Sequence, residues 1–276
     1  GWTHDEFGAA VALDGFVAAV ATQYHQYHGA VYVYRSDGGP WIEEQKLIAS
    51  DGAFEDFFGR AVDIDRDRVV VGAPGDDDGA TASGSAYVFE YNGIAWVETH
   101  KLLASDAAYL HQFGRALALD GDVLAVMARQ GGEFPAVYIF RYDGSAWIEE
   151  QKIQPSDQTS FDHFGFSVDL EGDLLVCGAD FQDDPVISCG AAYVFRFDGT
   201  TWVEEMKLIA SDAGEFDQLG HAVSLNGNVI VAGAINDDDN GNNAGAAYVY
   251  RHDGANWLEE AKLTASDGAS SDYFGF

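Results

Sequence analysis

The stretch Phe58-Gly59-Arg60-Ala61-Val62, followed by Val69-Val70-Val71-Gly72-Ala73-Pro74, decides how this sequence folds. Its Phe-Gly start recurs at spacings of 51, 55, 51, 55 and 55 residues, with one Leu in place of Phe. The recurring anchors are Phe7, Phe58, Phe113, Phe164, Leu219 and Phe274. A period near fifty residues that is built from short strands is typical of propellers and solenoids. The sequence therefore predicts a tandem β repeat.

Each repeat holds four short runs that read as strands, named A to D in chain order. In the second repeat they cover residues 59–64, 68–73, 86–91 and 96–102. These runs are rich in β-branched and aromatic residues and are bounded by Gly, Asp or Asn. Asp-Gly and Asn-Gly pairs between A and B and between C and D predict tight two-residue turns. We therefore expect an all-β chain, a β-propeller of four-stranded antiparallel blades.

The repeat predicts a single β-propeller domain over residues 1–276, with five complete blades and the start of a sixth. The blades cover about 5–50, 56–105, 111–156, 162–211 and 217–266, and residues 267–276 open a further blade. In a closed ring of five, Phe7-Gly8 and Phe274-Gly275 would claim the same place. We therefore expect the sequence to be part of a longer chain, and a five-bladed ring with a displaced tail is the alternative.

Charge is the outlying feature of the composition. The 276 residues include 46 acids against 14 Lys and Arg, which gives a net charge of −32. Such a surface repels phosphate backbones and anionic lipid, which argues against nucleic-acid and membrane-surface partners. No apolar run approaches the ~20 residues of a membrane helix, so no membrane insertion is expected.

One connection varies in length while the rest of the repeat is constant. The anchor always lies 14 residues before the position of Gly72. The strand-C Tyr always lies 9 residues before the strand-D Trp, and that Trp lies 17 residues before the next anchor. The loop between strands B and C accounts for the whole difference between 51 and 55 residues. Because a rigid frame with one free loop is how binding surfaces are usually mounted, function is expected on the face of the B–C and D–A loops.

Periodic polar and aromatic residues are interpreted as structural. One Trp in each strand D is expected to pack between neighbouring sheets. An Asp two residues before most anchors, and a repeated Ser-Asp pair, are expected to cap backbone N–H groups of the D–A loops. The five Trp residues are Trp41, Trp96, Trp147, Trp202 and Trp257.

The pattern Phe-Gly-x-Ala/Ser-Val, Val-Val-Gly-Ala-Pro and Gly-x-Ala-Tyr-Val-Phe resembles the FG-GAP repeat over essentially the whole chain. That resemblance implies the propeller found at the head of integrin α-subunits and in many secreted or surface bacterial proteins, with a total of seven blades favoured. The family's calcium run lies in the A–B loop, which here is a two-residue turn as in Glu171-Gly172. So short a turn does not supply six to eight oxygens, so the calcium site does not carry over, and the chain looks closer to the short-turn bacterial form.

Acidic B–C loops in the second, fourth and fifth repeats are the candidate metal sites. Two interpretations stay open: weak binding of Ca²⁺ or another divalent cation, or solvated turns in which Asp and Asn are favoured. The run from Asn236 to Gly241 resembles the first half of a calcium loop, but Ala247 stands where a Glu would close it. The candidate ligands are Asp76, Asp78, Asp180, Asp183, Asn236, Asp238 and Asn240.

Two other features have an open interpretation. The short loop of the first repeat carries Tyr24, His25, Tyr27 and His28, which suit sugar or metal contact but also a polar aromatic turn. Cys177 and Cys189 flank the B–C loop of the fourth repeat. They are candidates for a disulfide or for buried thiols, and a bond would favour an oxidising compartment.

No catalytic constellation is found, so the chain is expected to be non-enzymatic. The predicted function is an extracellular or cell-surface adhesion or recognition module that binds protein or glycan through the long-loop face. The alternative is a self-assembling building block of a surface layer or filament. A propeller glycoside hydrolase is the third hypothesis, and it would require two facing carboxylates in a deep pocket.

Overall fold

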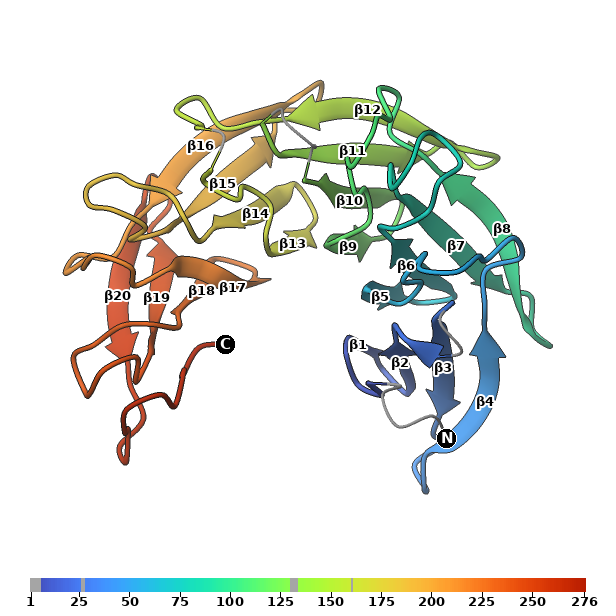
Figure 1. The fold of residues 1–276 in the computed structure, drawn as a ribbon, viewed down its shortest axis with the longest axis horizontal. Helices are drawn as coiled ribbons and strands as arrows, with labels where there is room; N and C mark the ends of the chain where they lie inside the picture. Colours follow the sequence, from blue (N-terminus) through green and yellow to red (C-terminus); the bar gives the residue numbers. More distant parts are fainter. Residues whose placement is uncertain (1–5, 26–27, 130–133, 160) are drawn as a thin grey trace. The chain divides into compact units, whose positions relative to one another are not determined.

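The computed structural model describes residues 6–25, 28–129, 134–159 and 161–276, and these form five four-stranded antiparallel sheets that do not close into a barrel (Figure 1). The all-β prediction is confirmed. The described residues include no helix with the length and hydropathy to cross a membrane. The chain divides into two compact units, Gly1–Glu133 with Tyr138–Lys152 and Phe134–Val137 with Ile153–Phe276. That the chain is a single propeller domain, and that the whole propeller has seven blades, both stay predictions.

Each sheet is a simple up-and-down meander in which strands A to D follow one another (Figure 1). The first sheet contains β1 Val11–Asp14, β2 Val17–Thr22, β3 Ala30–Arg35 and β4 Ile42–Leu47. The second contains β5 Ala61–Asp65, β6 Arg68–Ala73, β7 Ser85–Tyr91 and β8 Trp96–Leu102. The third contains β9 Leu117–Asp120, β10 Val123–Ala128, β11 Ala136–Tyr142 and β12 Trp147–Ile153.

The second unit holds two further sheets of the same design. The fourth sheet contains β13 Val168–Glu171, β14 Leu174–Ala179, β15 Ala191–Phe197 and β16 Trp202–Leu208. The fifth contains β17 Leu219–Asn226, β18 Val229–Ala234, β19 Ala246–His252 and β20 Trp257–Leu263. In the second repeat, strands B and D have the predicted bounds, while strand A begins two residues later than expected.

The A–B turns are two-residue turns, as predicted: Asp65 pairs with Arg68, and Arg66 takes a positive φ of 55°. The C–D turns are not. Tyr91 pairs with Trp96, so four residues lie between the strands. Within this loop Gly93 has the expected positive φ, and the Asn92 Oδ1 accepts the backbone N–H groups of residues 94 and 95. The prediction of two-residue C–D turns was wrong because the Asp or Asn side chain closes a wider loop.

The recurring Phe fills the core between neighbouring sheets. Phe58 is 1% exposed, and its ring meets Tyr87 at 5.5 Å and Phe89 at 6.0 Å in edge-on contacts. Phe113 meets Tyr138 and Phe140 in the same way within the first unit. Such pairs add to the area that each ring buries. The anchor is therefore the residue that fixes the start of one strand A against strand C of its own sheet.

The glycines around the anchor are required by close backbone approach. A Cβ on Gly72 would lie 1.9 Å from the carbonyl oxygen of Gly114, the anchor glycine of the next sheet. A Cβ on Gly233 would likewise lie 1.8 Å from the carbonyl oxygen of Gly275. Gly59 itself has a φ of 95°, a left-handed conformation that other residues rarely adopt. The Gly-Ala-Pro and Phe-Gly motifs are thus two halves of one contact between sheets.

Polar side chains fix the D–A loops, as the sequence predicted. Asp56 accepts the backbone N–H of Ala53 at 2.5 Å, and Asp217 accepts that of Gly214 at 2.6 Å. In addition, the Ser of the first four Ser-Asp pairs donates both its N–H and its hydroxyl to a Glu of the following strand D, as Ser50 does to Glu98 at 2.8 and 2.7 Å. The sequence did not predict this second contact, which links a loop to the next sheet.

The strand-D Trp residues pack between sheets, which confirms the structural interpretation. Four of them are 3–6% exposed, whereas Trp41 of the first sheet is 47% exposed. The Trp96 indole N–H donates to Glu44 of the first sheet at 3.0 Å. Trp therefore serves the contact between sheets.

Replacement of Gly72 by Ala tests the close approach. Because the new methyl group would overlap the Gly114 carbonyl, the two sheets must shift, and the free energy of unfolding should fall by about 2 kcal/mol. Urea unfolding of the purified chain measures this change. The control is Gly52→Ala, where the nearest atoms lie 3.4 Å from the added carbon and where little change is expected. Equal stability of the two variants would contradict the assignment.

Candidate functional site

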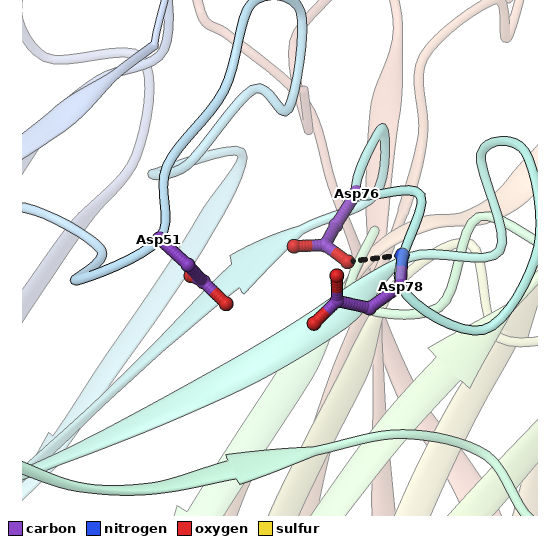
Figure 2. Close-up of side chains that lie close together, drawn as sticks. All are labelled: Asp51, Asp76 and Asp78. Carbon is purple, nitrogen blue, oxygen red and sulfur yellow. Dashed lines mark hydrogen bonds between the residues drawn. The ribbon is translucent and has the colours of Figure 1, made fainter.

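Three carboxylates from two loops converge at the end of the second sheet. Asp51 lies in the D–A loop after β4, and Asp76 and Asp78 lie in the B–C loop after β6 (Figure 2). One ligand oxygen of each lies within 4.8 Å of the others, so among the described residues this group could hold a metal ion. Asp76 also accepts the backbone N–H of Asp78 at 3.0 Å, which fixes the loop. The backbone thus presents the acids together.

The ammonium group of Lys101 lies among these carboxylates. Its Nζ is 2.7 Å from Asp51 Oδ2, 2.8 Å from Asp76 Oδ2 and 2.5 Å from Asp78 Oδ2. The Tyr87 hydroxyl lies 2.8 Å from Asp51 Oδ1 and from Asp76 Oδ2, and its one proton can go to only one of them at a time. Strand D therefore supplies a fixed cation where an ion would sit.

The charges of this cluster stabilise one another. Burial alone would lower the pKa of Lys101, but hydrogen bonds to Asp51, Asp76 and Asp78 outweigh it, and the pKa is raised. For Asp51 and Asp76, burial would raise the pKa, but hydrogen bonds from Lys101, Tyr87 and the backbone together outweigh it and the pKa is lowered. The positive charge of Lys101 and the negative charges of Asp51 and Asp76 therefore stabilise one another.

The fifth sheet repeats the cluster with different residue numbers. Lys262 Nζ lies 2.9 Å from Asp212, 2.7 Å from Asp237 and 2.6 Å from Asp239. The Tyr248 hydroxyl lies 2.6 Å from Asp212. The position of Asp76 is thus taken by Asp237, four residues after the strand-B glycine in both sheets.

The other two clusters hold fewer acids. In the fourth sheet Lys207 Nζ contacts Asp157 at 2.8 Å and Asp184 at 3.4 Å, and Gln182 takes the position of Asp76. In the third sheet, whose B–C loop has no Asp, Lys152 contacts Asp106 at 2.7 Å. The lysine is present in every sheet, while the number of acids around it depends on the sequence of the B–C loop.

The fifth-repeat residues that were predicted to ligate a metal do not converge. Asp238 accepts the backbone N–H of Asn243 at 2.7 Å, and Asn236 donates to Gln218 at 2.7 Å. Asn240 is exposed. Asp237 and Asp239 contact Lys262 instead. The acids that converge are thus one residue away from the positions that the resemblance to a calcium loop predicted. The lysine on strand D, in line with the strand-C Tyr, is the sequence signal that identifies the right acids.

The fourth-repeat candidates also separate. Asp183 accepts the backbone N–H of Ser188 at 2.8 Å, which caps the loop. Asp180 is 1% exposed, and its carboxylate oxygens lie 3.0 Å from His221 Nδ1 and 3.3 Å from His163 Nδ1. Sequence reasoning missed this pair of histidines because they come from the starts of two different repeats.

The histidine loop of the first sheet borders a hollow of about 250 Å³. His25 and His28 line it together with Lys46 and Ile48. Tyr24 is exposed and contacts the ring of Phe57 at 5.7 Å. Tyr27 lies outside the described residues. The predicted ligand loop is thus at a concave surface, beside a lysine that occupies the same strand position as Lys101.

Cys177 and Cys189 are free, buried thiols in this structure. Cys177 faces Val168 and Tyr193 in the sheet register, while the Cys189 Sγ donates to the Gln182 carbonyl at 3.6 Å. Burial raises the pKa of both thiols. The structure therefore has the buried thiols and not the disulfide.

Replacement of Lys101 by Met tests the role of the ammonium group. The three carboxylates lose their counterion, and because two of them are partly solvated the free energy of unfolding should fall by about 2 kcal/mol. Calcium should then raise the melting temperature of the variant more than that of the wild type, because the position is vacated. The matched control is Lys152→Met, which leaves one carboxylate and should show neither effect. Equal responses of both variants to calcium would contradict this account.

The acid dependence of stability gives a second test. Because the pKa values of Asp51 and Asp76 are lowered from 3.8 in the folded chain, their contribution is present above about pH 4 and lost as the pH falls through the folded values. In Lys101→Met the carboxylates repel one another in the folded chain, and protonation at low pH relieves that repulsion. The difference in unfolding free energy between wild type and variant should therefore shrink from pH 7 to pH 3 in urea titrations. A constant difference would contradict the pairing.

Comparison with protein families gives one clear result. A family model described as FG-GAP repeat matches residues 41–89, 96–140, 147–195, 202–250 and 257–276, most of the chain and part of every sheet. Comparison with curated proteins gives no match. Repeats of this kind are typical of extracellular or surface proteins and suggest a propeller-type recognition or adhesion module. With its Phe-Gly anchors, its glycine contacts and these matches, the chain belongs to the FG-GAP repeat family.

Proposed function

We propose that this chain is a non-enzymatic recognition module that binds a protein or glycan through the surface of its B–C and D–A loops, outside the cell or at its surface. The observation that carries the proposal is a constant frame bearing unlike loops. The lysine, tyrosine and D–A clamp recur from sheet to sheet, while the B–C loops differ in length and charge. A frame that holds variable loops rigidly suits recognition, because little entropy is then lost on binding.

The rigidity of these loops has a direct physical source. In the second sheet, Lys101 ties the B–C loop to the preceding D–A loop through Asp76 and Asp51. Asp77 further accepts the backbone N–H of Ala82 at 2.6 Å, and Asp238 does the same for Asn243 at 2.7 Å. Both loops are therefore held in place before any ligand arrives.

The carboxylates of these clusters support a non-enzymatic role. A glycoside hydrolase needs one carboxyl with a raised pKa and a second one free to act as a base or nucleophile. Asp51 and Asp76 have lowered pKa values, because hydrogen bonds from Lys101, Tyr87 and the backbone together outweigh burial. They are therefore poor proton donors near neutral pH.

Calcium is not needed to hold the loops under this proposal. Three carboxylates and a tyrosine oxygen surround Lys101, and a calcium ion at the same position would have to displace its ammonium group. Calcium also takes six to eight oxygen ligands, whereas one oxygen from each of three carboxylates converges here. We therefore propose that the lysine takes the role that an ion has in a calcium-dependent loop.

The hollow beside His25 and His28 is the best candidate for ligand contact in the first unit. Its volume of about 250 Å³ is near the lower end for small-molecule sites, which suits one sugar ring or one side chain. The imidazoles and the Lys46 ammonium offer hydrogen bonds, and Ile48 offers an apolar wall. This mixture is typical of specific ligand sites.

The test is binding to an immobilised panel of glycans and extracellular-matrix proteins. Wild type should bind at least one member, and the double variant His25→Ala with His28→Ala should bind it about tenfold more weakly at an unchanged melting temperature. The control is Arg66→Gln, an exposed residue of an A–B turn, which should bind like wild type. Absence of binding to the whole panel, together with self-association in sedimentation, would overturn the proposal in favour of a building block.

A further inference from the structure

Basic side chains in this acidic chain are nearly all paired with carboxylates. Ten of the 14 Lys and Arg residues have a carboxylate oxygen at 3.8 Å or less. Among the described residues, Lys46, Arg60, Arg115 and Arg129 have none. With 46 acids available, four unpaired cations are unexpected, and three of them belong to one place in the first unit.

The backbone brings these three arginines to the same end of neighbouring strands. Arg60 follows the anchor glycine Gly59, and its N–H donates to the Gly72 carbonyl at 3.3 Å. Gly72 in turn lies against Gly114, the residue before Arg115, since a Cβ on it would be 1.9 Å from the Gly114 oxygen. Arg60 and Arg115 thus lie just before β5 and β9, the strands A of two sheets that are in contact.

Arg129 joins them from the B–C loop of the third sheet. Gly114 donates its N–H to the Met127 carbonyl at 3.0 Å, and the Met127 N–H donates to the Ala116 carbonyl at 2.9 Å. Arg115 is therefore directly opposite strand B, and Arg129 follows Met127 by two residues where β10 has ended. The three guanidinium groups come from two D–A connections and one B–C loop, which places them on the proposed recognition face of the first unit.

The positive charges of the three arginines act on one another. Arg115 is partly buried, and its Nη1 donates to one neutral acceptor, Gln112 Oε1, at 3.1 Å. Burial and the positive charges of Arg60 and Arg129 lower the pKa of Arg115. Like charges held together without a counterion are destabilising, so an anion that joined them would be favoured.

We propose that Arg60, Arg115 and Arg129 bind an oxyanion group, a carboxylate or sulfate, which the ligand of this protein carries. Guanidinium groups offer planar pairs of donors that match such groups. The net charge of −32 repels dense polyanions at long range, so a single acidic group is favoured over a polymer such as a nucleic acid. The inference rests on the proposed recognition face and names one chemical feature of its ligand.

The test uses the purified chain with sodium sulfate or sodium glucuronate, each compared with sodium chloride at equal ionic strength. Wild type should show a saturable rise in melting temperature with either anion, and glucose in place of glucuronate should give none. Arg115→Gln should bind about tenfold more weakly, because one charge-assisted contact is lost. Arg66→Gln, which removes the same charge from an A–B turn, should respond like wild type.

Two results would overturn the inference. Identical sulfate and glucuronate responses in wild type, Arg115→Gln and Arg66→Gln would mean a general salt effect and no site. A lower melting temperature of Arg115→Gln without any added anion would mean that Arg115 supports the fold, whereas an anion site predicts an equal or higher one. A response to sulfate alone would support the site and assign it to a sulfate group. Because these probes are small anions, failure here leaves binding to the glycan and protein panel intact as a separate result.

Discussion

The second and third sheets, and likewise the fourth and fifth, approach so closely that only glycine fits at the contact between them. The carbonyl oxygen of Gly114 occupies the space that a Cβ on Gly72 would need, and Gly178 and Gly220 repeat this contact in the second unit. Side-chain contacts between the same sheets depend on this spacing. The Ser105–Glu149 pair and the Tyr138–Asp106 hydrogen bond each join residues 32 to 44 positions apart. They form only if the anchor sets the distance first.

The same spacing determines what the acidic residues do. Because each D–A loop is carried onto the next sheet, its Asp meets a lysine and a tyrosine that the next repeat supplies, as Asp212 meets Lys262 and Tyr248. An acid that looks solvated along the sequence is therefore part of a charged network in the structure. The chain offsets part of its own negative charge in this way, and the longer B–C loops of the second and fifth repeats add acids where the lysine already stands.

Sequence reasoning predicted the frame well because the frame is periodic. Strand bounds, the A–B turns, the Trp packing and the capping role of Asp56 all follow from spacing and residue type within one repeat. It predicted the site less well, because the site joins two repeats. Nothing within the fifth repeat alone distinguishes Asp237 from Asp238, since both stand in one acidic run. Asp237 differs from Asp238 because it contacts Lys262 of strand D, which also contacts Asp212 of the preceding repeat.

Because most basic side chains of the chain contact a carboxylate, the few described ones that do not are informative. A frame that places a carboxylate beside Lys101, Lys152, Lys207 and Lys262 has a ready means of neutralising a basic side chain. Lys46 stands at the same strand position, yet among the described residues it meets the Tyr32 ring and the hollow beside His25. Arg115 likewise meets the amide of Gln112, and the positive charge of Arg60 acts on it. Lys46 lies on β4, while Arg60 and Arg115 lie in D–A connections. In a chain so rich in acids, a cation that the frame leaves without a carboxylate is best explained by a partner from outside the chain.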